Sequence, residues 1–160
     1  MRATTFAILT SVGCYLFTKI GFALTPARSP IATFWPPNAM LLASLLLAPR
    51  VAWKFLLLAV LPAHLLVQLQ TGVSFATALG WFVGNVGEAI IGATLIRHSS
   101  RSEELFKSLR GVTIFLIFGA LIAPLLTSFA DAAVVLARLV GGMRIGDCGP
   151  SVSFRMCWRN

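Results

Sequence analysis

Polar and ionisable side chains that could bind a ligand or relay a signal stand inside long apolar stretches of this 160-residue chain. Asn85 and Glu88 are three residues apart, and His64 and Gln68 are four apart, so each pair would share one face of a helix. An ionisable group inside hydrocarbon is costly, which makes it a candidate functional group. The candidates for ligand sensing or signal relay are Lys19, Trp35, Asn38, His64, Gln68, Asn85, Glu88 and Asp131.

Glu88 is the most informative of these residues, because it lies near the middle of its apolar run, where a side chain cannot easily reach water. Gly80 and Gly84 form a small-xxx-small pair on the same helix, and Gly87 adds another small residue, so a second backbone could approach closely. We therefore expect the Glu88 face to point into a helix bundle. A structural carboxyl group, protonated or hydrogen-bonded to a neighbouring helix, explains Glu88 equally well.

The other candidates also have structural explanations. Lys19 can extend its ammonium group to the membrane interface, and His64 and Gln68 can each bond a neighbouring helix. Asp131 lies about one bilayer length after Gly111, which places it near the outer interface. These residues predict either a polar pocket that receives a ligand from outside or a hydrated network between packed helices. The residues expected in the outer half are Lys19, Asn38, His64, Gln68 and Asp131.

Catalytic and metal-binding motifs are absent from the sequence, which has no HExxH, GxSxG, P-loop or Rossmann glycine pattern. Cys148 and Cys157 lack a CxxC spacing and a nearby His, so no zinc site is expected. Cys14 lies inside an apolar run and is predicted to be inert packing. The sequence therefore predicts no enzyme, no metal and no cofactor.

The composition is that of a membrane protein. Hydrophobic residues make up 58% of the chain, charged residues make up 11%, and the mean hydropathy is +0.87, whereas about a quarter of a soluble domain is charged. The net charge of +8 comes from 13 Lys and Arg against 5 Asp and Glu. These cations stand at the ends of apolar runs, where they meet anionic lipid, and they form no basic face for nucleic acid. The predicted fold class is all-α, a polytopic transmembrane helical bundle.

Five apolar runs predict the helices of this bundle, at residues 4–24, 35–48, 51–70, 74–96 and 111–140. A signal peptide is the alternative for the first run, but the run is long for one and ends in a poor cleavage site. The second run opens with Trp35, Pro36 and Pro37, and proline is tolerated in a first helical turn. It is short for a bilayer, which needs about 20 residues. Pro62 and Pro124 are expected to bend the third and fifth helices.

Basic residues in the connections predict the orientation of the bundle. Arg50 and Lys54 lie at the second connection, and four basic residues lie in the fourth, 97–110. The third connection, 69–73, has none, and the first has only Arg28. Because cytoplasmic connections carry the excess of Lys and Arg, the N-terminus is predicted to be cytoplasmic and the end of the fifth helix external.

Motifs along the chain, taken in order, are similar to those of a known sensor family. Asn85 and Glu88 fall on matching positions of the fourth helix of that family, the first membrane-associated sensor (MASE) domain family of bacterial sensor kinases and diguanylate cyclases. The resemblance covers about residues 4–137. The stretches that carry it are Lys19-Ile20-Gly21, Phe34–Ala43 with its Trp35-Pro36-Pro37, Phe82–Ala89, Pro124-Leu125-Leu126 and Asp131-Ala132-Ala133.

The resemblance implies a sensory input module of the bacterial inner membrane, with about eight helices joined to a cytoplasmic output such as a histidine kinase, a diguanylate cyclase or a phosphodiesterase. The implied partners are the lipid bilayer, a second copy or other helices, and an unidentified small-molecule or membrane-derived signal. Since the sequence predicts about five helices and no output domain, we expect a truncated fragment that cannot transmit alone.

The last segment, 141–160, is polar and patternless, and the resemblance stops at about Arg138. In a shifted frame, the possible codons for Ser153–Arg159 permit Ser-Asn-Val-Leu-Ala, which resembles the start of the family's sixth helix. We therefore expect a disordered tail that is the frameshifted translation of a longer gene. Coincidence among degenerate codons is the alternative, and the coding DNA would distinguish the two.

Two other classes of membrane protein also fit the residues. A small transporter or permease subunit would use Glu88 and His64 as a proton or substrate relay. A structural membrane subunit would use the same polar groups for helix packing alone. Many transporters contain inverted repeats, and this sequence shows none, which favours the sensory module.

Overall fold

Helices make up the structure, a computed structural model that describes residues 3–25, 35–100 and 105–142. Within those ranges there is no strand, so the predicted all-α class is confirmed. In chain order the elements are α1 Ala3–Ala23, α2 Pro36–Leu47, a 3₁₀ turn Arg50–Ala52, α3 Trp53–Gln70, α4 Phe75–Ser99, α5 Leu109–Phe115, a π-helical segment Leu116–Ile122 and α6 Ala123–Gly142.

Four of the helical segments are long and apolar enough to cross a membrane, which confirms the predicted transmembrane bundle: Thr4–Ala23, Arg50–Gln70, Phe75–Ser99 and Leu109–Val134. The fifth, α2, has 12 residues and is therefore about 18 Å long. The hydrocarbon core of a bilayer is about 30 Å thick. By itself α2 is too short to cross it.

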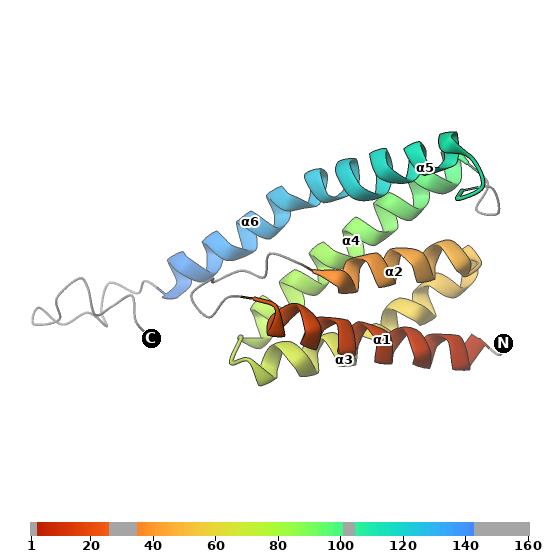
Figure 1. The fold of residues 1–160 in the computed structure, drawn as a ribbon. Coiled ribbons are helices and arrows are strands. Elements are labelled where there is room, and N and C mark those ends of the chain that lie inside the picture. The colour runs from red at the N-terminus through yellow and green to blue at the C-terminus, as the bar shows by residue number, and fades with distance from the viewer. Residues whose placement is uncertain (1–2, 26–34, 101–104, 143–160) are drawn as a thin grey trace, which may run out of the picture.

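Helix α4 is central to the bundle (Figure 1). It packs against α2, α3 and α6, whereas α1 packs against α2 and α3. The rod formed by α5 and α6 runs along α4 (Figure 1). The start of α1, the end of α2, the start of α3, the end of α4 and the start of α5 all lie at one end of the bundle (Figure 1). Because α2, α3 and α6 all contact α4, side chains of α4 can connect them.

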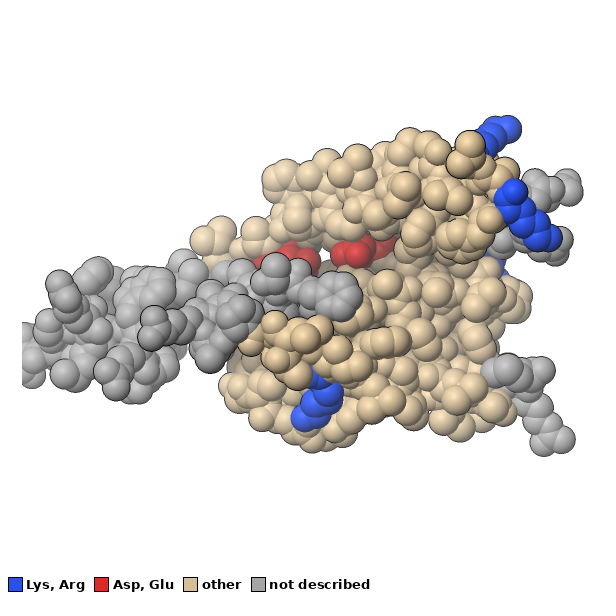
Figure 2. All heavy atoms as spheres, in the orientation of Figure 1, with Lys and Arg blue, Asp and Glu red and all other residues tan. Residues whose placement is uncertain are grey.

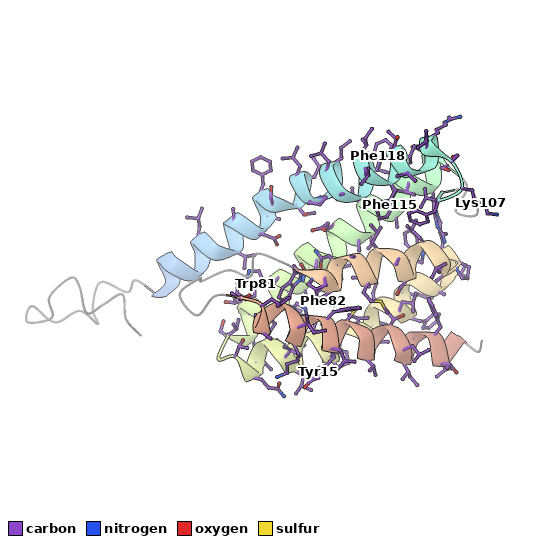
Figure 3. The ribbon with its side chains drawn as sticks, in the orientation of Figure 1. Tyr15, Trp81, Phe82, Lys107, Phe115 and Phe118 are labelled. Carbon is purple, nitrogen blue, oxygen red and sulfur yellow. The ribbon has the colours of Figure 1, made fainter. Side chains whose placement is uncertain are left out.

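The apolar core lies where α2, α3 and α4 meet, and it includes the fully buried Leu45, Leu56 and Ile96. Phe115 and Phe118 of the last helix pack against this core (Figure 3). Many large apolar side chains instead cover the outside of the bundle. Such a surface suits a helix bundle that is surrounded by lipid.

Local sequence explains how α4 and α5 begin. The side chains of Ser74 and Ser108 accept backbone N–H bonds from Thr77 and Gly111, at 3.3 and 3.1 Å, and so cap the two helices. The short turn between α3 and α4 contains Gly72, whose φ of 80° would strain a larger residue. These caps and this turn set the start of α4, the helix that carries Glu88.

The last apolar run forms a continuous helix. Just before Pro124 it changes from α-helical to π-helical turns, which are wider. Pro124 has no N–H to donate to the carbonyl four residues earlier, that of Ala120. Ala120 falls inside the π-helical segment Leu116–Ile122, where the turns are wider than in an α-helix. The sequence predicts a bend at Pro124, and the structure places the irregular turn immediately before it.

Candidate functional site

Glu88 is hydrogen-bonded to a second helix near the middle of α4. The side-chain amide of Asn38, in the first turn of α2, donates from Nδ2 to Oε2 of Glu88 at 2.9 Å. Glu88 lies thirteen residues after Phe75, the first of the 25 residues of α4. The first turn of α2 is therefore level with the middle of α4, and Asn38 links the start of α2 to Glu88.

A third helix reaches the same carboxyl group through Thr127. Its hydroxyl Oγ1 lies 3.4 Å from Glu88 Oε2 and 3.1 Å from the carbonyl oxygen of Ala123. A hydroxyl has one proton, so at any moment Thr127 donates to one of these acceptors and can accept a bond itself. Thr127 is buried. One carboxyl oxygen of Glu88, Oε2, thus lies within hydrogen-bond distance of both α2 and α6.

Asp131 lies against the glycine-rich face of α4, one helical turn from Glu88. A Cβ atom at Gly84 would collide with the Asp131 carboxylate, and one at Gly80 would lie 3.1 Å from Cγ2 of Val134. These glycines make room for side chains of α6. The sequence analysis expected them instead to let the backbone of another helix approach closely. Glu88 and Asp131 are the acidic residues of the described ranges, so the red atoms in the hollow of Figure 2 are theirs.

The site holds two carboxyl groups without a cation beside them. Among the described residues, no Lys, Arg or His nitrogen lies within 4.0 Å of either group. Glu88 and Asp131 are close enough to interact electrostatically, so two ionised groups would repel each other in a low-dielectric environment. The positive end of the α2 dipole favours negative charge at Glu88. The site can therefore exchange a proton or accept hydrogen bonds from a ligand.

His64 and Gln68 form a separate buried pair where α3 meets α4. His64 Nε2 lies 3.2 Å from the carbonyl oxygen of Ala78, and its ring lies 5.5 Å from that of Phe82, which Figure 3 labels. Gln68 is 2% exposed, and its Oε1 has no hydrogen-bond partner. Within the described residues no hydrogen bond joins His64 to Glu88, so the two residues of the transporter relay are not brought together.

The remaining candidates lie elsewhere. Lys19 Nζ donates to Oε1 of Gln70 at 2.8 Å, an exposed contact near the ends of α1 and α3. Trp35 precedes α2, and its ring meets Phe22 of α1 edge-on, with centroids 5.4 Å apart. Asn85 is half-buried, and its side chain has no hydrogen bond within the described part of the chain. Of the eight candidates, three share one site: Asn38, Glu88 and Asp131.

A comparison with protein families decides what kind of module these helices form. The model of the MASE1 family matches residues 6–148. The chain belongs to the MASE1 family. MASE1 domains are membrane-associated sensory domains, so the resemblance drawn from the sequence is confirmed, and the chain is a membrane sensory module. No curated protein and no solved structure matches it.

The MASE1 match covers every described helix except the first three residues of α1. It ends eleven residues beyond the predicted coverage of about 4–137, at residue 148, and so includes the first part of the predicted tail, 141–160. Of that tail, residues 143–160 lie outside the described residues. Disorder and a frameshift there stay predictions.

The end of α2 is also hydrogen-bonded to other helices of the bundle. Nη2 of Arg97, near the end of α4, donates to the carbonyl oxygens of Leu45, Leu46 and Ala48 at 3.0, 2.8 and 2.6 Å. The indole Nε1 of Trp53 donates to the Leu45 carbonyl at 3.0 Å. The last carbonyls of a helix have no partner within it, so these two side chains satisfy the end of α2 and fasten it to α3 and α4.

Sequence reasoning missed both Thr127 and Arg97. Thr127 is four residues before Asp131, so a helix places the two on one face, and that spacing was a usable signal. Arg97 was assigned to the polar segment 97–110, but α4 continues to Ser99. A basic residue in the last turn of a helix often bonds helix-terminal carbonyls. Nothing in the sequence indicates that these carbonyls belong to a different helix.

A groove of about 540 Å³ runs between α4 and α6 beside this site. It is mainly apolar, and it adjoins the Glu88 network through Gly84 and Thr127. Within the described ranges no group of three or more His, Cys, Asp or Glu residues could hold a metal ion. The residues that line the groove are Ala76, Leu79, Gly80, Val83, Gly84, Gly87, Thr127, Ala130 and Val134.

Proposed function

We propose that Glu88, with Asn38, Thr127 and Asp131, receives the signal of this sensory module. The bond between Asn38 and Glu88 carries the proposal, because it makes the start of α2 depend on the state of one carboxyl group. A proton that binds here, or a small molecule that donates hydrogen bonds, changes the charge and the free acceptors of Glu88. Such a signal reaches the site from outside the cell or from the bilayer.

Helix α2 carries the change to the opposite end of the bundle. It has 12 residues and is bonded to α4 at both ends, by Asn38 at its start and through Arg97 at its finish. A hydrogen-bonded helix of this length moves as a unit. A shift at Glu88 therefore changes the position of α2 beside Arg97 and Trp53, from which a cytoplasmic output takes its input.

We place this output end in the cytoplasm and the bundle in the bacterial inner membrane. Basic side chains support the orientation, because cytoplasmic connections carry more Lys and Arg than external ones. Among the Lys and Arg residues of the described helices, Lys19 lies at the opposite end, where it bonds Gln70, and Arg138 lies in the last part of α6. The N-terminus is then cytoplasmic, and catalysis belongs to the output, outside these helices. The basic residues at the output end are Arg50, Lys54, Arg97, Lys107 and Arg110.

The experiment compares Glu88→Gln with Glu88→Leu in the complete signalling protein, with output and membrane expression both measured. Glu88→Gln keeps an acceptor for Asn38 but loses the ionisable group, so we expect normal expression and altered output. Glu88→Leu also removes the acceptor, so we expect reduced expression as well. Asn85→Ala, three residues away on the same helix, is the matched control and should change neither. Normal output and expression in both Glu88 variants would show that this site receives no signal.

A further inference from the structure

Two arginine side chains meet at the output end of the bundle, and only one of their nitrogens bonds the carbonyls of α2. The Cζ atoms of Arg97 and Arg50 lie 5.4 and 5.9 Å from the ring centroid of the same Trp53, so one indole holds two guanidinium groups. Arg97 bonds the carbonyls of α2 through Nη2 alone. Its Nε is buried without a partner. Its Nη1 donates no hydrogen bond to any described residue.

No carboxylate neutralises these cations within the described ranges. Glu88 and Asp131 are the acidic residues there, and Glu88 lies nine residues before Arg97 on α4, about 14 Å along the helix axis. Lys54, one helical turn after Arg50, adds a third positive charge. Carbonyl dipoles stabilise a guanidinium group but leave its full charge in place. The cluster is thus suited to an anion that comes from outside the described chain.

An exposed apolar stripe begins beside these cations. Val51, Phe55 and Leu58 are 78%, 61% and 65% exposed, and their spacing of four and three residues places them on one face of the helix. Leu47, which ends α2, is also 78% exposed. Cations at the head of an apolar stripe match a phospholipid, whose phosphate is joined to acyl chains.

We propose that Arg50, Lys54 and the free edge of Arg97 bind the phosphate of an anionic phospholipid, and that its acyl chain lies along Val51, Phe55 and Leu58. A lipid with net negative charge is favoured over a zwitterionic one, because each basic side chain near the headgroups attracts net negative charge. The site requires only that this end of the bundle meets the headgroups. It therefore stands apart from the role of Glu88, and either proposal can fail alone.

Native mass spectrometry of the purified full chain in detergent tests the proposal, with phosphatidylglycerol or phosphatidylcholine of the same acyl chains as the probe. The variant is Arg50→Gln with Lys54→Gln. Its matched control is Lys107→Gln with Arg110→Gln, which removes the same charge from exposed positions at the same end. We expect the unaltered chain to prefer phosphatidylglycerol, the variant to bind it about tenfold more weakly, and the control to change less than about twofold.

Three results would overturn the proposal. Equal affinity of the unaltered chain for the two lipids would exclude a site for an anionic headgroup. Equal losses in the variant and in the control would mean that overall charge, and no particular site, attracts the lipid. Displacement of phosphatidylglycerol by millimolar inorganic phosphate would mean that the cluster binds free phosphate. Retention of the lipid in that competition supports the acyl contacts along α3.

Discussion

The two ends of α2 are both bonded to α4, but by different chemistry. At its start, Asn38 donates a single hydrogen bond to Glu88. At its finish, the Arg97 guanidinium donates to three carbonyls, and the Trp53 indole adds another bond. The bonds from Arg97 are always charge-assisted, whereas the Asn38 bond is charge-assisted only while Glu88 is ionised. The Arg97 end is thus the fixed end of α2, and the Glu88 end is the one that a small chemical change can release.

The largest expected effect comes from the fixed end. Arg97→Gln removes a charged donor from three carbonyls of α2, so we expect a loss of about 3 kcal/mol in the free energy of unfolding. Thermal unfolding of the purified protein in detergent measures it. Arg110→Gln, at an exposed residue of α5, is the control and should cost less than about 0.5 kcal/mol. Similar losses in both variants would mean that Arg97 does not fasten α2.

A smaller effect is expected where α6 meets the Glu88 end. Gly84→Ala places a Cβ against the Asp131 carboxylate, so α6 must shift, and overpacking of this kind costs about 1–3 kcal/mol. Gly87→Ala is the matched control in the same helix, because its Cβ meets Cγ2 of Thr127 at an ordinary 3.9 Å. Thermal unfolding should separate the two variants. Equal stability of both would show that α6 packs less closely on α4 than the structure indicates.

The sequence predicted the helices well because four of them are long apolar runs, for which the bilayer allows few alternatives. It also identified Glu88, since a carboxyl group in the middle of such a run is costly. It did not give the partners of Glu88. Asn38 is 50 positions away and Thr127 is 39 positions away along the chain. Which helices meet at Glu88 depends on three-dimensional packing, which helical periodicity does not encode.

The polar pocket expected in the outer half shows the same limit of sequence analysis, because its residues had to converge from several helices. Counting residues from the helix ends placed five polar candidates in the outer half, but it did not fix the direction in which each side chain points. Lys19 bonds Gln70 at the exposed end of α1 and α3, and His64 faces α4 through Ala78. Depth in the membrane is a property of one helix, whereas a pocket needs side chains from several helices to converge.

The orientation of the bundle in the membrane decides which end of α2 faces the output. It is tested by labelling, which involves no change in stability. Single cysteines at Thr71 and Ser99, in a chain whose own cysteines are replaced by serine, are treated with an impermeant thiol reagent in intact cells. We expect labelling at position 71 but not at position 99, because the basic connections are cytoplasmic. Labelling at 99 but not at 71 would reverse the account and put the Arg97 end outside.

A double-mutant cycle between Asn38 and Glu88 tests the central claim, that this one bond couples α2 to the signal-receiving carboxyl group. Asn38→Ala, Glu88→Leu and the double variant are compared in thermal unfolding and in signal output of the complete protein. If the two residues act through their bond, the double variant loses about 1 kcal/mol less than the sum of the single variants, and its output equals that of Glu88→Leu alone. Additive losses, with an output that Asn38→Ala changes further, would contradict the claim.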